Sequence, residues 1–168
     1  RNLDYVTEDA DGLRVGAMAR HDEIEKNALV KRLCPMLSEA ASVIGDVQVR
    51  HRGTIGGSVV HADPAADYVP VLVAADARFQ LQSRGGTRTI EAKKFFVDIM
   101  RTTIEPGELL VEIQIPRSKE KFGFAYRRLS RVEGAYAIAN AAAIVDGNAK
   151  SVRIVIGGVC PKPVIIQE

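Results

Sequence analysis

Hydrophobic and polar residues alternate with two different periods along the chain, and the first half follows mainly the helical one. Residues 12–18 alternate apolar and polar positions with a period of two, which predicts a short strand. Residues 21–34 place apolar residues at helical spacing with acids in the first turn, and residues 36–45 continue as a second helix after Pro35. Helical spacing returns in residues 64–77. The first half is therefore predicted to be mainly helical.

The second half has the pattern of strands. Residues 78–83 and 88–92 alternate around the Arg-Gly-Gly of residues 84–86, which is typical of a hairpin. Residues 108–116 alternate again, and three further candidate strands follow in residues 122–130, 135–145 and 151–159. The alanine-rich middle one also fits a helix, and periodicity alone does not decide. Early helices and late strands predict an α+β fold with an antiparallel sheet flanked by helices.

Composition and charge limit the classes of partner. The chain has 168 residues, 46% of them hydrophobic, which is enough for one domain or two small subdomains. A net charge of +2 gives no field that would attract nucleic acid. No apolar run is long enough for a membrane span and no export leader is present, while Cys34 and Cys160 lack metal-ligand spacing. We therefore expect a soluble, cytoplasmic protein with reduced cysteines.

Residues 49–67, VRHRGTIGGSVVHADPAAD, concentrate the unusual chemistry of the chain and are predicted to form a loop. Within them, the TIGGS of residues 54–58 has glycines that can turn backbone N–H groups toward one point, beside hydroxyl donors. This composition suits a phosphate cradle. A single Gly-Gly pair by itself is more typical of a tight turn, and neither common nucleotide-binding loop pattern occurs in the chain.

A metal site is the third interpretation of the same stretch. His61, Asp63 and Asp67 would offer an imidazole and two carboxylates to one ion. Asp63 also suits the N-cap of the following helix, and Asp67 an acid in its first turn. No nucleophile stands in a known catalytic motif, so no catalytic residue is predicted. The residues by themselves leave the cradle, the turn and the metal site open.

Several motifs in order resemble the FAD-binding medium subunit of molybdenum hydroxylases, the family of bacterial carbon monoxide dehydrogenase and of the flavin domain of xanthine dehydrogenase. Residues 50–77 resemble the family's second flavin-contacting segment. KKFFVDIMRTTIEPGELLVEIQIP (93–116) and FAYRRLSRVEGAYAIANAAA (124–143) resemble the stretches that follow it. LRVGAMARHDEIEKNALVKRLCPML (13–37) resembles the strand and helices before it, so the similarity covers nearly the whole chain.

The resemblance implies a fold of the vanillyl-alcohol-oxidase type, in which FAD lies between an N-terminal subdomain and a larger antiparallel subdomain. Residues 1–160 are similar to the larger subdomain, and residues 161–168 are expected to begin a linker to a C-terminal domain. The family's other glycine-rich loop, of the A-G-G-x-S-L type, does not occur in these residues. We therefore expect the N-terminal subdomain and the C-terminal domain to be absent here, and the chain to be a piece of a longer subunit.

The resemblance also implies the cofactor contacts. In the family, the T-I-G-G-N segment wraps the FAD diphosphate and ribityl region, which assigns that role to Thr54, Ile55, Gly56 and Gly57. Ser58 stands where the family usually has asparagine, so one hydrogen bond to the cofactor is expected to be missing or shifted.

Four more positions follow from the same likeness. Asp67 resembles the acid that bonds polar groups of the flavin nucleotide, Leu110 the apolar residue beside the ring system, and Ile44 a contact on the adenine side. Arg127 is close to the position at which the family carries a lysine near the isoalloxazine or its electron acceptor. Arginine at this position keeps the charge but changes the hydrogen-bond geometry.

The implied function is electron transfer. A molybdenum large subunit with its molybdenum cofactor would oxidise the substrate, an iron-sulfur small subunit with 2Fe-2S clusters would relay electrons, and FAD in this subunit would pass them to NAD or a quinone. The alternative is a flavin-free scaffold or assembly subunit of the same complex. Neither interpretation involves nucleic acid or a membrane span.

Overall fold

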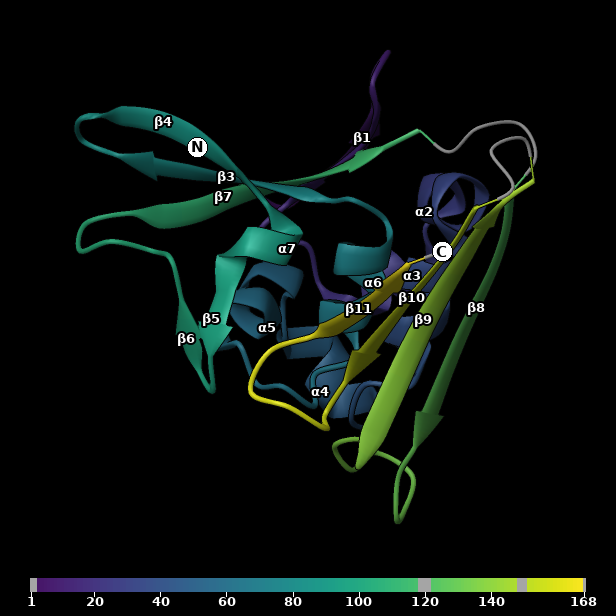
Figure 1. Ribbon diagram of the computed structural model, residues 1–168. Coiled ribbons are helices and arrows are strands. Elements are labelled where there is room, and N and C mark those ends of the chain that lie inside the picture. The colour runs from purple at the N-terminus through teal and green to yellow at the C-terminus, as the bar shows by residue number, and fades with distance from the viewer. Residues whose placement is uncertain (1–2, 118–121, 148–150, 168) are drawn as a thin grey trace.

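The computed structural model describes residues 3–117, 122–147 and 151–167, with helices in the first half and strands predominating in the second (Figure 1). The helices are α1 His21–Lys26, α2 Ala28–Leu33, α3 Pro35–Ser42, α4 Val47–Arg52, α5 Ile55–His61, α6 Tyr68–Ala74 and α7 Ala92–Phe95. Among the described residues, no helix has the length and apolar character that crossing a membrane requires.

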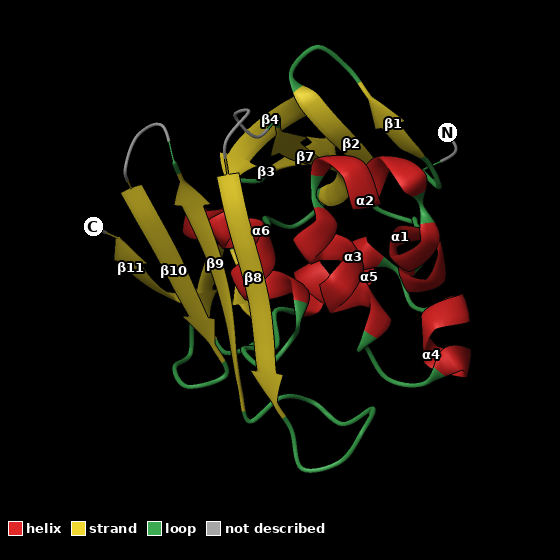
Figure 2. Cartoon of the chain, turned by 90° about the vertical axis from the view of Figure 1, so that its right-hand side faces the viewer, coloured by secondary structure: helices red, strands yellow, loops and turns green. Residues whose placement is uncertain are grey.

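The strands form antiparallel sheets on two sides of the helices (Figure 2). The strands are β1 Val6–Glu8, β2 Gly12–Gly16, β3 Arg78–Ser83, β4 Gly86–Glu91, β5 Phe96–Asp98, β6 Arg101–Thr102, β7 Leu109–Pro116, β8 Phe122–Leu129, β9 Ala139–Asp146, β10 Ser151–Gly157 and β11 Val164–Gln167. One sheet has the order β1-β2-β7-β3-β4, a second the order β11-β10-β9-β8, and β5 pairs with β6. The α+β prediction, with antiparallel sheets flanked by helices, is confirmed.

The core lies between the inner face of the five-stranded sheet and the helices. Alternate residues of β2, β3 and β7 point into it, including Val15, Phe79 and Ile113, none of which is exposed. Phe95 packs edge-on against Phe79 with ring centroids 4.7 Å apart. All of α6 is buried, because it packs on α3 on one side and on β9 and β10 on the other. Burial of this apolar area is the main force that holds the helices between the sheets.

Two predicted helices have different limits in the structure. The helix expected over residues 21–34 is divided at Asn27, whose backbone is extended and whose side chain accepts hydrogen bonds from the N–H groups of Leu29 and Val30. The helix expected from residue 64 begins only at Tyr68. Asp63 does not cap it, since its carboxylate accepts from the Ala65 N–H within a preceding turn. Short polar side chains that bond the nearby backbone explain both errors.

The alanine-rich segment forms strand β9, which pairs with β8 on one edge and β10 on the other. Ala142 is fully buried there, and its small side chain lets α6 lie close to the sheet. Because this segment pairs with a neighbouring strand on both edges, it is a strand and not the helix that its periodicity also allowed. The expected strands in residues 12–18, 78–83, 88–92, 108–116, 122–130 and 151–159 are also present.

Residues 161–168 were expected to begin a linker. Within this segment Val164–Gln167 forms β11 and pairs with β10, and residue 168 lies outside the described residues. These four residues therefore belong to the second sheet. The division of the chain at residue 160 stays a prediction.

Candidate functional site

A cavity of about 560 Å³ lies where the start of α1, the α4–α5 region, the start of α6 and the β8–β9 connection meet. Its volume is within the range of small-molecule sites. Five of the predicted cofactor-contacting residues line it: Ile44, Thr54, Gly57, Ser58 and Asp67. The structure therefore brings together residues that span 24 positions of the chain.

The predicted loop at residues 49–67 is largely helical, which corrects the sequence interpretation. Thr54 is the N-cap of α5, and its Oγ1 accepts from the Gly57 N–H at 3.1 Å. The N–H groups of Ile55 and Gly56 donate to the carbonyls of Ala19 and Ala17 at 3.0 and 2.9 Å. These amides are thus occupied within the protein, and the donors that remain at this helix start are hydroxyl groups.

The two glycines of the Gly-Gly pair meet different surroundings. A Cβ on Gly56 would lie 2.5 Å from the Ala17 carbonyl oxygen, so a hydrogen at this position lets α5 approach the end of β2. A Cβ on Gly57 would meet only Thr54 Oγ1, at 3.1 Å, and Gly57 is exposed where it lines the cavity. Gly56 therefore serves packing, whereas Gly57 keeps the cavity wall open.

Asp67 is the buried charge of the cavity, with 5% of its surface exposed. The Tyr126 hydroxyl donates to its Oδ1 at 2.5 Å, and Arg128 Nε lies 3.5 Å from the same oxygen. Arg128 also donates to the carbonyls of Val43 and Ala135, which ties β8 to the end of α3 and to the β8–β9 connection. Burial raises the pKa of the Asp67 carboxyl, although the Tyr126 hydrogen bond and the Arg128 charge oppose this.

The raised pKa of Asp67 gives stability a defined pH dependence. The ordinary value is 3.8, and the folded carboxyl holds its proton more tightly than the unfolded one. This contribution to stability is therefore complete below the ordinary value and is lost as pH rises through the folded pKa. Relative to Asp67→Asn, the wild type is expected to lose free energy of unfolding as the pH rises from the ordinary pKa of 3.8 toward neutrality, measured by urea unfolding. A constant difference between the two proteins over that range would contradict the prediction.

Four of the predicted site residues do not line the cavity. Ile55 and Gly56 are buried beneath it, and Leu110 is 7% exposed on β7, where it pairs with Leu81. The Arg127 side chain is 80% exposed and lies 3.5 Å from the Glu39 carboxylate on α3.

Sequence reasoning did not assign His21 and Tyr136, which line the cavity, or Tyr126 and Arg128, which contact Asp67, to the site. They come from α1, β8 and the β8–β9 connection, and no local motif connects them with residues 54–67. The sequence did indicate that one of the adjacent residues Arg127 and Arg128 would face the helices, because alternate side chains of a strand point to opposite faces. The missing information was which face of β8 the helices cover.

The metal alternative is not supported by the geometry. No group of three His, Cys, Asp or Glu residues with the arrangement of a metal site occurs in the part of the chain that the structure describes. His61 and Asp67 both line the first cavity, but Asp63 does not, and its carboxylate accepts a hydrogen bond from the Ala65 N–H.

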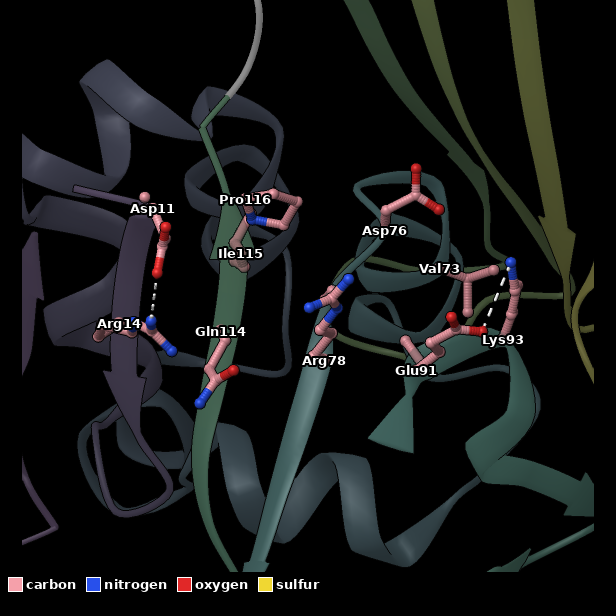
Figure 3. Close-up of a pocket in the computed structure, with 13 residues that line it drawn as sticks. Asp11, Arg14, Val73, Asp76, Arg78, Glu91, Lys93, Gln114, Ile115 and Pro116 are labelled. Atoms are coloured by element: carbon pink, nitrogen blue, oxygen red, sulfur yellow. Dashed lines mark hydrogen bonds and ion pairs between the residues drawn. The ribbon is translucent and has the colours of Figure 1, made fainter. Parts of the chain in front are cut away.

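A second cavity, of about 570 Å³, lies at one end of the five-stranded sheet (Figure 3). Its acids and bases are balanced and several are paired with each other, as Arg14 is with Asp11 at 3.4 Å and Lys93 with Glu91 at 3.5 Å. None of the predicted site residues lines it. It shows no preference for one charge class of ligand.

The fold and the first cavity together describe an α+β protein with a ligand-sized cavity beside a glycine-containing helix start. Residues 1–118 match the family described as the FAD binding domain in molybdopterin dehydrogenase, and the chain belongs to this family. FAD is the cofactor of that family, so the resemblance found in the sequence is confirmed.

Two individual proteins that the chain resembles are medium chains of dehydrogenases. The chain is 36% identical over 159 residues to the carbon monoxide dehydrogenase medium chain of Hydrogenophaga pseudoflava, covering 93% of this chain and 55% of that protein. It is 37% identical over 169 residues to the glyceraldehyde dehydrogenase medium chain of Sulfolobus acidocaldarius, covering 99% of this chain and 60% of that protein. The chain thus spans little more than half the length of these relatives.

Solved structures show the same fold. Carbon monoxide dehydrogenase from Hydrogenophaga pseudoflava, in a form that lacks the Mo-pyranopterin moiety, superimposes with a TM-score of 0.92 at 35% identity, over 97% of this chain and 58% of that chain. Quinoline 2-oxidoreductase from Pseudomonas putida 86 gives a TM-score of 0.90 at 30% identity, over 97% and 57% of the two chains.

Proposed function

We propose that this protein is the FAD-carrying electron-transfer subunit of a molybdenum hydroxylase located in the cytoplasm. The observation that carries the proposal is the cavity, because five residues assigned to FAD by resemblance line one ligand-sized space. Membership of an FAD-binding family and similarity to dehydrogenase medium chains support it.

The residues around the cavity fit a flavin nucleotide. Thr54 and Ser58 contribute hydroxyl groups, and Gly57 adds no side chain that would fill the space. Arg52 lines the same wall and has no ion pair among the described residues, so its charge is free for an anionic group. Ile44 and Val49 provide apolar surface for a ring. We assign the diphosphate to the hydroxyl side and the apolar part of the nucleotide to Ile44.

Asp67 has a positioning role in this proposal. Tyr126 and Arg128 hold Oδ1 of its carboxylate, and Asp67 lines the cavity. This carboxylate would accept a hydrogen bond from a hydroxyl of the nucleotide. Ile55, Gly56 and Leu110 would act indirectly by supporting the wall, and Arg127 faces solvent, where a partner or an electron acceptor could reach it.

Bound FAD would supply the redox chemistry, accepting electrons and passing them on, so no side chain of this subunit needs to act as an acid or base. An iron-sulfur small subunit and a molybdenum large subunit are the proposed partners, carrying the 2Fe-2S clusters and the molybdenum cofactor. NAD or a quinone is the proposed final acceptor. The free thiols Cys34 and Cys160 are compatible with the reducing cytoplasm.

The proposal predicts that Gly57→Asp removes FAD from the natural full-length protein. Aspartate at the third position of α5 favours the helix start, but it places a negative charge in the cavity beside the proposed diphosphate. Repulsion of this kind costs several kcal/mol, so FAD affinity is expected to fall about 100-fold or more. Bound flavin is measured by its absorption after purification and by titration of the apoprotein.

Gly85→Asp is the matched control, because Gly85 lies in the open β3–β4 turn and the same change there is expected to leave FAD content unaltered. Equal FAD affinity in Gly57→Asp and wild type would exclude this cavity as the diphosphate site. A wild-type protein that neither contains nor takes up FAD would favour the flavin-free scaffold instead.

A further inference from the structure

His21, at the start of α1, is a buried histidine at the cavity wall. Only 4% of its surface is exposed, and its Nδ1 lies 3.0 Å from the hydroxyl of Tyr68 on α6. The two rings are tilted against each other with centroids 5.3 Å apart. A backbone hydrogen bond from the His21 N–H to the Gly53 carbonyl, 3.1 Å long, fixes the start of α1 beside the segment that precedes α5.

The Tyr68 contact determines which ring nitrogen of His21 carries the proton. Tyr68 is fully buried, and burial raises its pKa well above the ordinary value, so the phenol keeps its proton. Among the described residues, His21 Nδ1 is the only acceptor for that proton. Tyr68 therefore donates to Nδ1, and the ring proton resides on Nε2. Burial and the nearby charge of Arg50 lower the pKa of His21 to about 4, which keeps the imidazole neutral at pH 7.

Gly53 leaves His21 Nε2 uncovered. A Cβ on Gly53 would lie only 2.6 Å from this nitrogen, although the backbone angles there, φ −66° and ψ 145°, are open to any residue. The glycine is thus explained by the neighbouring imidazole and not by backbone strain. Both residues line the cavity, and no described protein group accepts a hydrogen bond from Nε2.

Arg52 and Thr54 line the same side of the cavity and flank Gly53 in the chain. A neutral N–H donor, a free guanidinium and a hydroxyl group at one wall together suit an anionic oxygen. The Arg52 charge attracts an anion without fixing the geometry of a hydrogen bond, whereas the His21 ring is held in one orientation by its hydrogen bond with Tyr68. His21 is therefore the rigid donor of this set.

We propose that His21 donates a hydrogen bond from Nε2 to a diphosphate oxygen of the bound flavin nucleotide, and that Gly53 lacks a side chain so that this donor remains accessible. The inference rests on the proposed function, since it requires FAD in this cavity. It adds a binding residue that lies outside the glycine-containing segment and that the sequence pattern did not indicate.

The test is titration of the natural full-length apoprotein with FAD and, separately, with riboflavin, which lacks phosphate. His21→Phe removes the donor and Gly53→Ala covers it, and each is expected to weaken FAD binding about 10- to 100-fold, as expected for a hydrogen bond to a charged group. Riboflavin affinity is expected to stay within about 3-fold of wild type in both variants. Tyr68→Phe removes the hydrogen bond that orients the ring and sets its tautomer but leaves Nε2 in the protein, so it is expected to weaken FAD binding by a smaller factor than His21→Phe does.

His21→Phe also leaves the Tyr68 hydroxyl without its acceptor, so the double variant His21→Phe/Tyr68→Phe separates folding from binding. We expect the double variant to recover stability in urea unfolding but not FAD affinity. FAD binding by His21→Phe within 3-fold of wild type, or an equal loss for riboflavin, would overturn the inference. Failure of the wild type itself to bind FAD would instead overturn the proposed function.

Discussion

Gly56→Ala is expected to destabilise the protein by about 3 kcal/mol, whereas Gly57→Ala is expected to change stability by less than about 1 kcal/mol. The new methyl group on Gly56 would lie 2.5 Å from the Ala17 carbonyl oxygen and 2.7 Å from the Ala17 Cβ. Ala17 directly follows β2 and is itself buried, so its backbone has little freedom to move away. The 2.9 Å hydrogen bond from the Gly56 N–H to Ala17 would be strained by the same shift.

Gly57→Ala is the adjacent control for this result. Its methyl group would meet only Thr54 Oγ1, and alanine favours a helix more than glycine does. The measurement is the free energy of unfolding in urea, followed by circular dichroism. A loss of less than 1 kcal/mol for Gly56→Ala would show that α5 does not approach Ala17 as closely as the structure indicates.

Arg128→Met is expected to cost about 3–5 kcal/mol of stability, because it leaves a buried carboxylate without its cation. Asp67 keeps the hydrogen bond from the Tyr126 hydroxyl in that variant but loses the Arg128 charge, and the Val43 and Ala135 carbonyls lose their donor. Protonation of Asp67 would relieve part of this cost, so the destabilisation is expected to be smaller at acidic pH.

Arg127→Met tests the neighbouring arginine. The Arg127 guanidinium is exposed, and its contacts are the 3.5 Å approach to Glu39 and a hydrogen bond to its own neighbour's carbonyl. Removal of such a surface charge is expected to change stability by less than about 0.5 kcal/mol. Urea unfolding of both variants at neutral and acidic pH checks the pair. An equal cost for Arg127→Met and Arg128→Met would contradict the placement of β8 against the helices.

Gly56 and Arg128 also show that the walls of the cavity depend on packing between distant segments. The Arg128 side chain joins β8, the end of α3 and the β8–β9 connection, while Gly56 allows α5 to contact the end of β2. Both contacts hold the walls at the positions from which Thr54, Gly57 and Asp67 line the cavity. The residues that position the site are therefore different from the residues that would touch the cofactor.

The sequence by itself determined the α+β class, the strands of both large sheets except β1 and β11, and the segment that lines the first cavity. Alternation with a period of two is a local property, so β3, β4 and β7 were predicted within a residue or two. The TIGGS segment and Asp67 also stand in one continuous motif, which made the family recognisable without any structure.

Only the tertiary structure decided which of two adjacent residues lines or supports the cavity. Gly56 and Gly57 look alike in the sequence, as do Arg127 and Arg128, and their roles differ because one of each pair faces protein and the other faces space. His21 joined the site in the same way, through contacts with Tyr68 and Gly53, which lie 47 and 32 positions away in the chain. Contacts between distant segments depend on how helices and sheets pack, and no local pattern of residues encodes that packing.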